Sequence, residues 1–377
     1  MHKDIIADRM ARIDSSGIRK VFDLAAELDA PVNLSIGQPD FDVPEQIKAA
    51  AIDAIQKGNN KYTHTQGIAE LNDAVRERYM RLYNFSADAS LITSGVSGGI
   101  LLALMTMINA GDSVILTDPY FVIYKHIVTL LGGTIKYLDT YPDFRIYKER
   151  LETLIRQSSE KPKLMIISSP SNPTGVVYSK EELAVIVSLC KEHDIFLIAD
   201  EIYDNFVYDV PQASVAEIAD TEDCLILNGF SKNTAMTGWR LGYALGPKEL
   251  IQKMTILQQY TFICAPAPVQ YAGLAALQYD NSEIIRTFTQ RRDVMYQGLR
   301  EIGYEVAQPD GAIYMFPKAL GTSATDFVTK AVRNNLLIIP GNVFSERDTH
   351  FRISYSSDIK TIQSGLEILK KLYAAYQ

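Results

Sequence analysis

The chain has few cysteines, and their spacing suits no cross-link. Only three occur in 377 residues, Cys190, Cys224 and Cys264, and none belongs to a Cys-x-x-Cys pair. An odd, scattered set of this kind predicts neither a disulfide framework nor a structural zinc site, and we expect no metal. A reducing compartment, the cytoplasm, is the expected location.

Long hydrophobic runs are also missing. The longest, Ile100–Ile108, is about half of the roughly 20 residues that a membrane-spanning helix needs. Charged residues interrupt the apolar residues of the first nine positions, so we expect no secretory signal peptide. The sequence therefore predicts no membrane partner.

Basic residues form no cluster, and acidic residues outnumber them by 45 to 37, which gives a formal net charge of −8. This balance excludes the basic surface typical of a nucleic-acid-binding protein. The apolar fraction of 47% and the charged fraction of 22% are instead those of a soluble globular protein. At about 150 residues per domain, the length favours two domains or three.

Short apolar runs alternate with helical patterns through the middle of the chain. The runs are Ser113–Thr117, Leu164–Ser168, Ile195–Ala199 and Cys224–Leu227, and Glu181–Glu192 is a predicted amphipathic helix between two of them. Runs that are apolar on both faces and alternate with helices indicate parallel strands covered on both sides. We therefore predict an α/β fold whose large three-layer domain, residues 45–280, has a mostly parallel central sheet.

The pattern changes after about residue 280. Residues 281–377, joined by the opening segment 1–44, are predicted to form a smaller α+β domain. Its expected elements are helices over Ser282–Ile302 and Asp358 to about Tyr373, and strands near Tyr304–Ala307, Ala312–Phe316, Leu336–Ile339 and Phe351–Tyr355.

Open α/β sheets bind ligands at the carboxyl ends of their strands, so polar residues there are candidates for a site. Ser94–Gly99 opens an apolar helix and offers backbone N–H groups to an anion, or is only a tight turn. Ser168–Gly175 is either a simple loop or a device that holds the Asn172 amide at a strand end. Asp200 needs a cation or a protonated ring nitrogen as partner, unless it caps a helix.

Lys232 gives the sharpest signal, because it follows an apolar strand and lies near the only tryptophan, Trp239. Burial there would lower the pKa of its amine and let it form a Schiff base with a carbonyl; solvent exposure is the alternative. Arg240, eight residues on, can bind a phosphate. Arg352, in an alternating strand, can form a two-bond fork to a carboxylate or be a surface arginine.

Taken in order, these segments resemble the class I and II aminotransferases, a family of pyridoxal-phosphate enzymes with the fold of aspartate aminotransferase. The matching motifs cover nearly the whole chain: Ser35–Phe41, Asp118–Tyr120, Asn172–Gly175, Asp200–Tyr203, Ser231–Lys232, Gly238–Arg240, Gly311–Tyr314 and Arg352–Ser354. The segment Ser16–Leu24 is most similar to the prokaryotic branch of the family. The resemblance implies pyridoxal 5'-phosphate as the cofactor.

The resemblance also implies a catalytic role for Lys232, Asp200 and Tyr203. Lys232 would carry the cofactor as a Schiff base and move a proton between the substrate Cα and the cofactor C4′. Asp200 would keep the pyridine nitrogen protonated, so that the ring accepts electrons. Tyr203 and Asn172 would bind the phenolic oxygen.

The remaining implied roles concern binding. Tyr120 would stack on the cofactor ring. The phosphate would be bound by the backbone of Val96 and Ser97 and by the side chains of Ser231 and Arg240. The substrate carboxylate would be bound by Arg352, Asn172 and the main chain of Gly37. Tyr62 matches the residue that reaches the phosphate of the neighbouring subunit, which implies a homodimer with shared active sites.

Two positions depart from the family pattern. Gly229 stands where many relatives have a serine, so one hydroxyl for the phosphate is absent. Ser97 stands where some aspartate-specific relatives have a lysine, which leaves the amino donor open. Selection of the donor side chain depends on the surroundings of Ile18 and Tyr314.

The resulting prediction is a transaminase that moves an amino group from an L-amino acid to a 2-oxo acid such as 2-oxoglutarate. Two alternatives stay open: a β-eliminating carbon–sulfur lyase of the same fold, and a non-catalytic regulatory protein. The second needs an appended DNA-binding domain, and a match that begins within about 20 residues of the start leaves no room for one.

Overall fold

The computed structural model describes residues 5–14, 17, 28 and 30–377. Ile18, expected to shape the substrate pocket, lies outside the described residues, as does the whole Ser16–Leu24 motif except Gly17. None of the helices in the described ranges is long and apolar enough to cross a membrane.

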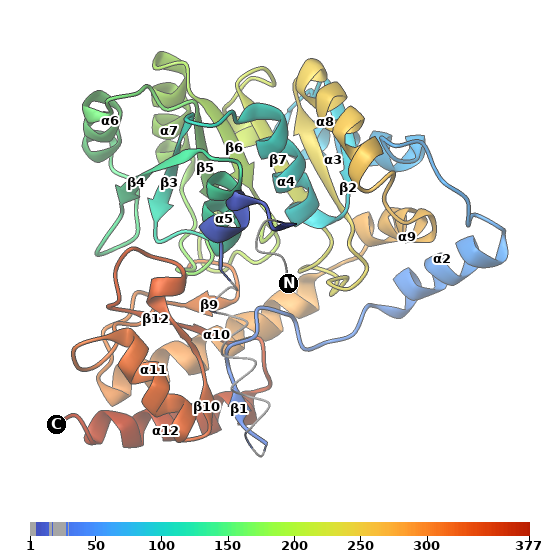
Figure 1. The fold of residues 1–377 in the computed structure, drawn as a ribbon. Coiled ribbons are helices and arrows are strands. Elements are labelled where there is room, and N and C mark those ends of the chain that lie inside the picture. The colour runs from blue at the N-terminus through green and yellow to red at the C-terminus, as the bar shows by residue number, and fades with distance from the viewer. Residues whose placement is uncertain (1–4, 15–16, 18–27, 29) are drawn as a thin grey trace.

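A seven-stranded sheet forms the centre of the larger part of the molecule (Figure 1). Its strands are β2 (Ala89–Thr93), β3 (Ser113–Asp118), β4 (Thr134–Asp139), β5 (Leu164–Ser168), β6 (Phe196–Asp200), β7 (Cys224–Gly229) and β8 (Gly242–Gly246). They lie in the order β2-β8-β7-β6-β5-β3-β4, and only β8 runs antiparallel to its neighbours. Every residue of β7 is buried, as expected for a strand covered on both faces. The predicted α/β class with a mostly parallel sheet is confirmed.

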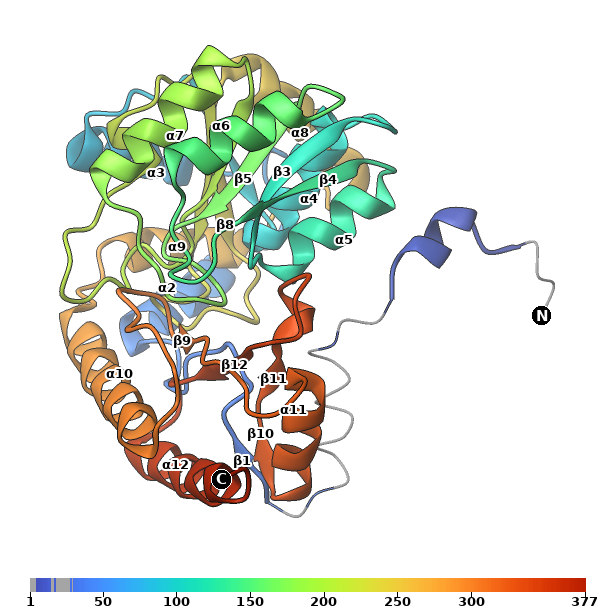
Figure 2. The ribbon, with the colours of Figure 1, turned by 90° about the vertical axis from the view of Figure 1, so that its left-hand side faces the viewer.

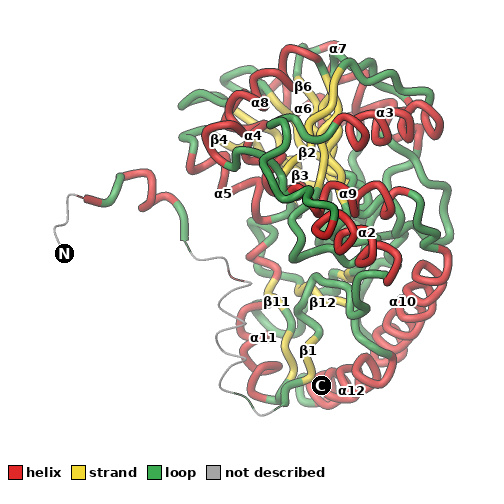
Figure 3. Tube along the Cα trace, turned by 90° about the vertical axis from the view of Figure 1, so that its right-hand side faces the viewer, coloured by secondary structure: helices red, strands yellow, loops and turns green. Residues whose placement is uncertain are grey.

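Helices cover both faces of this sheet. They are α3 (Ala69–Tyr83), α4 (Gly95–Met107), α5 (Val122–Leu130), α6 (Lys148–Gln157), α7 (Lys180–Glu192) and α8 (Lys248–Thr261). Two further helices, α2 (Glu45–Gln56) and α9 (Ala267–Leu277), pack against each other (Figure 1). Figure 3 shows the strands between α4, α5 and α8 on one side and α3 and α7 on the other. Short 3-10 turns occur at Asp8–Arg12, Val215–Glu217 and Gly341–Val343.

The C-terminal region builds a smaller layer of helices and short strands, and α10 (Ser282–Ile302) leads into it from the larger part (Figure 1). Its other elements are β1 (Val32–Asn33), β9 (Tyr314–Met315), α11 (Ala324–Arg333), β10 (Leu336–Leu337), β11 (Ile339–Pro340), β12 (Phe351–Ser354) and α12 (Ile359–Ala374). Helices α10 and α12 pack against each other along its outer side (Figure 2). Because β1 pairs with β10, the described part of the opening segment joins this layer, as expected. The domain boundaries at residues 44/45 and 280/281 stay a prediction.

The expected strand at Tyr304–Ala307 is wrong. This segment instead ends α10: Gly303 takes a left-handed conformation, and the Tyr304 amide donates to the carbonyl of Leu299 over 3.0 Å. The Tyr304 side chain is buried, and its hydroxyl donates to the carbonyl of Leu369. The aromatic and β-branched residues that suggested a strand therefore serve to close a helix and fill the core.

Candidate active site

Polar residues from distant parts of the sequence line one cavity of about 270 Å³ at the carboxyl ends of the parallel strands. The sheet register brings these ends together, because Ser168 pairs with Asp200 and Asp200 pairs with Leu227. The predicted site residues that line the cavity are Gly37, Val96, Ser97, Asn172, Asp200, Tyr203, Ser231, Lys232, Arg240 and Arg352. Most of the residues expected to act together are thus within one pocket.

Lys232 lies in the turn after β7. The hydroxyl of Thr234 donates to the carbonyl of Phe230 over 2.9 Å and closes this turn. The Lys232 Nζ donates to the carbonyl of Gly37 over 2.6 Å. Burial lowers the pKa of this amine from its ordinary value. Among the described residues Lys232 forms no ion pair, so its amine is available to react in the cavity.

The presence of glycine at position 229, where many relatives have serine, has a physical reason. A Cβ at this position would lie 2.9 Å from both the Cα of Gly242 and the carbonyl oxygen of Leu241. The two backbones of β7 and β8 approach too closely here for a serine. The missing hydroxyl is therefore a consequence of this close strand contact.

Asp200 ends β6 with its carboxylate buried in the cavity wall. The Tyr124 hydroxyl donates to Oδ2 over 2.6 Å, and the amide of Ile202 donates to Oδ1 over 3.2 Å. Burial raises the pKa of Asp200 to about 6, against these two hydrogen bonds, which lower it. The charge of Lys232 also lowers this pKa, but in the described part of the chain no cation forms a salt bridge with the carboxylate, so a protonated ring nitrogen in the cavity fits as its partner.

The first turn of α4 forms an anion cradle. No side chain caps the helix at Ser94, so the first backbone N–H groups, among them those of Val96 and Ser97, stay available to a ligand. Gly95 has a φ of +67°, and a Cβ there would lie 2.5 Å from Nη2 of Arg240. Glycine therefore lets the guanidinium approach the helix start.

Ser231 and Arg240 line the same cavity and complete this cradle, with the Arg240 guanidinium against the start of α4. Arg240 Nη1 donates to the carbonyl of Thr237 over 2.7 Å, which orients the guanidinium. A helix N-terminus, a hydroxyl and a guanidinium converge on one point of the pocket, and this donor set suits a phosphate group.

Arg352, on β12, is only 2% exposed. Its Nη1 donates to Asn172 Oδ1 over 3.1 Å, its Nη2 donates to the carbonyl of Ser35 over 2.8 Å, and its Nε has no partner among the described residues. Desolvation lowers the pKa of the guanidinium. No carboxylate of the described residues neutralises this buried cation, which is the arrangement that a carboxylate ligand would complete.

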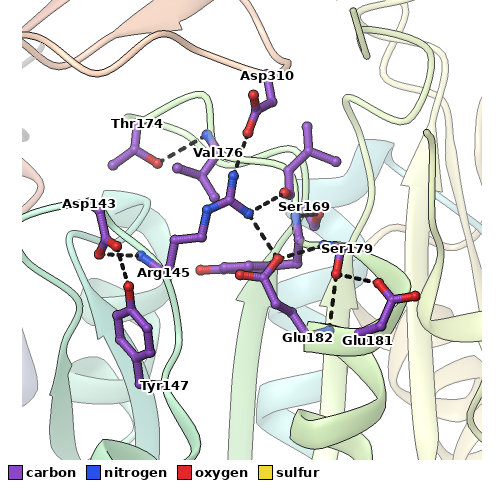
Figure 4. Close-up of polar contacts among 12 residues, drawn as sticks. Asp143, Arg145, Tyr147, Ser169, Thr174, Val176, Ser179, Glu181, Glu182 and Asp310 are labelled. Carbon is purple, nitrogen blue, oxygen red and sulfur yellow. Dashed lines mark hydrogen bonds and ion pairs between the residues drawn. The ribbon is translucent and has the colours of Figure 1, made fainter. Parts of the chain in front are cut away.

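A salt-bridge network fixes the loop that carries Asn172 (Figure 4). Arg145 donates to Glu182 over 2.9 Å, to Asp310 over 2.7 Å and to the carbonyl of Val177 over 3.0 Å. Glu182 also accepts from the amide of Ser179, as part of the capping box that starts α7. These contacts hold the end of the β5–α7 loop that leads into α7, and Asn172 of the same loop lines the cavity.

The structure corrects the expectation for Tyr120. Its ring stacks on Tyr137 with centroids 5.4 Å apart, its hydroxyl donates to Glu346 over 2.8 Å, and it does not line the cavity. The next residue, Phe121, lines the cavity instead. The backbone is extended here, so successive side chains point in opposite directions. The Asp118–Tyr120 motif therefore predicted the correct turn of the chain but the wrong one of its two adjacent aromatic residues.

Tyr62 lies apart from this cavity and is 80% exposed. A role at the cavity of the same chain is therefore excluded, and its role across a dimer stays a prediction. Sequence reasoning did not assign Tyr124, which holds Asp200, because nothing in its local pattern distinguishes it from a core tyrosine of α5.

Comparison with known proteins decides the family. A model of the family described as "Aminotransferase class I and II" matches residues 29–369. The chain belongs to this family. This aminotransferase is 36% identical to a protein named "Probable aspartate aminotransferase" from Methanocaldococcus jannaschii, over 98% of this chain and 100% of the relative. It is 35% identical to "Aromatic-amino-acid aminotransferase 2" from Thermococcus litoralis, over 97% of this chain and 98% of the relative.

A solved structure agrees. The aspartate aminotransferase from Thermotoga maritima has a TM-score of 0.92 to this aminotransferase at 30% identity, and the match covers 97% of this chain and 99% of that one. The predicted family, fold and class of enzyme are thus confirmed. The protein is a pyridoxal-phosphate-dependent transaminase, with pyridoxal 5'-phosphate as its cofactor.

Proposed function

We propose that this aminotransferase transfers the amino group of an L-amino acid to a 2-oxo acid such as 2-oxoglutarate, through a covalent bond between Lys232 and the cofactor. The observation that carries the proposal is one cavity that holds an unpaired lysine, a buried carboxylate and a buried guanidinium, Lys232, Asp200 and Arg352. None of the three forms a salt bridge with another described residue, although Lys232 and Asp200 interact electrostatically, and each is complemented by one part of the cofactor or the substrate.

The cofactor fits the residues around the cavity. Lys232 Nζ would bind its aldehyde carbon, Asp200 its ring nitrogen, and Tyr203 and Asn172 its phenolic oxygen. The phosphate would be held by the α4 backbone at Val96 and Ser97 and by Ser231 and Arg240. Phe121, rather than Tyr120, provides the aromatic face beside the ring. When bound, pyridoxal phosphate supplies an electron sink for the electrons of the broken Cα–H bond.

Lys232 Nζ moves the proton between the substrate Cα and the cofactor C4′. A general base works best when its pKa is close to the working pH, and burial lowers the pKa of this amine in that direction. The 2.6 Å hydrogen bond from this amine to the carbonyl of Gly37, a residue expected to contact the substrate carboxylate, supports this role. The same amine is thus able to serve both the covalent bond and the proton transfer.

Arg352 binds the substrate carboxylate, assisted by Asn172 and by the main chain of Gly37. Two of its N–H groups are already fixed by Asn172 and Ser35, so the orientation of the guanidinium is set before substrate arrives. Binding at this point aligns the Cα–H bond with the ring and excludes water from the buried cation.

We further propose a homodimer in the cytoplasm, in which Tyr62 reaches the phosphate of the partner subunit. Support comes from large exposed side chains: Phe262, which lines a groove together with Tyr62, is 37% exposed, and its sequence neighbours Tyr260 and Ile263 are 80% and 44% exposed. Exposed apolar side chains of this size are typical of a surface that another subunit covers.

An amino-donor screen with 2-oxoglutarate tests the proposal. Each L-amino acid is incubated with the holoenzyme, and glutamate is measured. We expect glutamate to form with at least one donor and only in the presence of the acceptor. Release of pyruvate and ammonia without any 2-oxo acid would contradict the proposal in favour of a lyase, an alternative that the names of the relatives do not favour.

A further inference from the structure

Tyr314 lies between the carboxylate site and the cofactor site. It begins β9 and pairs with Ser354 of β12, so the sheet of the smaller layer fixes its backbone. The side chain is buried, lines the cavity and contacts the site through two different parts, its ring and its hydroxyl. The proposed function assigns no role to the ring or to the hydroxyl of Tyr314.

The ring of Tyr314 packs against the carboxylate anchor. The Cζ of Arg352 lies 4.4 Å from the centre of this ring and 4.6 Å from that of Phe344. Aromatic rings stabilise a guanidinium by cation–π attraction, and this matters most where the cation is removed from water. Tyr314 therefore helps to keep Arg352 charged and limits the orientations that the guanidinium plane of Arg352 can adopt.

The hydroxyl of Tyr314 binds a different residue. It lies 2.8 Å from the hydroxyl of Tyr203, and the two rings meet edge to face with centroids 5.8 Å apart. In such a pair one hydroxyl donates and the other accepts. The positive charge of Arg352 against the Tyr314 ring favours Tyr314 as the donor, which leaves the proton of Tyr203 free for a ligand in the cavity.

We propose that Tyr314 is a positioning residue that serves the substrate carboxylate through its ring and the cofactor through its hydroxyl. The ring orients Arg352, and the hydroxyl directs the proton of Tyr203 toward the phenolic oxygen of the cofactor. A hydrogen bond that Tyr203 accepts also strengthens the one that it donates. This inference rests on the proposed function, because it needs both ligands to bind where that proposal places them.

Two substitutions separate the two parts of the side chain. Tyr314→Phe keeps the ring and removes the hydroxyl, whereas Tyr314→Leu removes both. Tyr304→Phe is the matched control, since it removes a buried hydroxyl of the same layer, hydrogen-bonded to the carbonyl of Leu369 and outside the cavity lining. Each holoenzyme is studied by titration of its visible absorbance with pH and by KM for one amino acid and its oxo acid.

In Tyr314→Phe we expect the midpoint of the absorbance titration to rise by about half a pH unit or more, because a weaker donor at Tyr203 stabilises the phenolate less. KM should stay within about twofold of the wild type. In Tyr314→Leu we expect KM to rise about tenfold or more for both substrates, in addition to the shifted midpoint. Tyr304→Phe should show the wild-type midpoint and KM.

An unchanged midpoint in Tyr314→Phe would overturn the role of the hydroxyl, and a wild-type KM in folded Tyr314→Leu would overturn the role of the ring. If Tyr314→Leu does not fold, the midpoint and KM of Tyr314→Phe still decide the first part, and Tyr314→Met replaces leucine for the second. Failure of the proposed function would give a different experimental result from failure of the role of Tyr314. In that case the wild-type enzyme forms no glutamate in the donor screen, whatever residue stands at position 314.

Discussion

Arg352 Nη1 donates to Asn172 Oδ1 over 3.1 Å, although the two residues are 180 positions apart in the sequence. The bond occupies the amide oxygen of Asn172, so its Nδ2 is free to donate to a ligand in the cavity. One residue comes from the smaller layer and the other from the loop after β5. The guanidinium proposed to anchor the substrate is therefore fixed to the amide proposed to contact the cofactor.

Substitution of Arg352 by lysine tests the carboxylate fork. Lysine keeps the charge but offers no planar pair of donors, so Arg352→Lys should lower kcat/KM for an amino acid and for its oxo acid alike. The expected loss is about 2–4 kcal/mol, the scale of a lost charged hydrogen-bond pair. Cofactor retention should be nearly unchanged, because Ser231 and Arg240 hold the phosphate.

A simple amine of matched size is the control for this variant. It has no carboxylate for the fork, so Arg352→Lys should hardly change its steady-state rate. Wild-type efficiency toward amino acids, with the cofactor bound, would place the carboxylate anchor elsewhere.

Asp200 is expected to act on the rate of proton removal. Asp200→Ala should fold and bind cofactor, but the barrier to Cα proton removal should rise by several kcal/mol, because the ring nitrogen loses the group that keeps it protonated. Single-turnover kinetics with a deuterated amino acid measure this step. Half-reaction rates close to those of the wild type would eliminate the role.

A buried carboxyl next to Asp200 predicts a pH dependence of stability. Glu201 accepts from the hydroxyls of Ser214 and Tyr79 and from the amide of Val215, and burial raises its pKa to about 8. The folded protein therefore holds a proton that the unfolded chain has lost above the ordinary glutamate pKa. The free energy of unfolding should fall as the pH rises from about 4.5 to about 8.

Glu201→Gln mimics the protonated acid and removes this titration. Urea unfolding of the wild-type and Glu201→Gln holoenzymes is measured at about pH 5.5 and about pH 8, near the two ends of the window set by the shifted pKa. Between these two pH values the variant should lose less free energy of unfolding than the wild type. Equal losses in both proteins would show that Glu201 is ionised in the folded state.

Tyr62 is expected to act across the dimer interface. Tyr62→Ala and Lys232→Ala should each be inactive or nearly so, and mixing them should restore activity, because hybrid dimers contain one site with both residues intact. The measurement is activity after subunit exchange, with exchange shown by mass spectrometry of a labelled partner. No recovery after demonstrated exchange would count against shared active sites.

Much of the site could be predicted from the sequence because its residues follow apolar strands. Asp200 is the last residue of β6 and Lys232 lies in the turn after β7, and parallel strands bring their carboxyl ends to one edge of a sheet. Helices such as α7 and α10 were likewise predictable from their periodicity, within one residue at each end.

What the sequence did not reveal depends on contacts between distant segments. Tyr120 and Phe121 are adjacent aromatic residues, and only the path of the chain into α5 decides which faces the cavity. Tyr124 looks like an ordinary core residue until folding places it against Asp200. Tyr314 was expected near the donor side chain, but its contact with Arg352 is visible only in the folded structure. The antiparallel direction of β8 is also set by pairing with its neighbours rather than by its own pattern.

Lys232 is proposed to be the residue that binds the cofactor covalently. The most direct measurement is reduction of the holoenzyme with borohydride, followed by peptide mapping of the labelled lysine. We predict that the wild-type label lies on Lys232 alone, and that Lys232→Ala loses both the label and the visible absorbance while retaining its fold. A label on another lysine, or an unchanged visible spectrum in Lys232→Ala, would contradict the account.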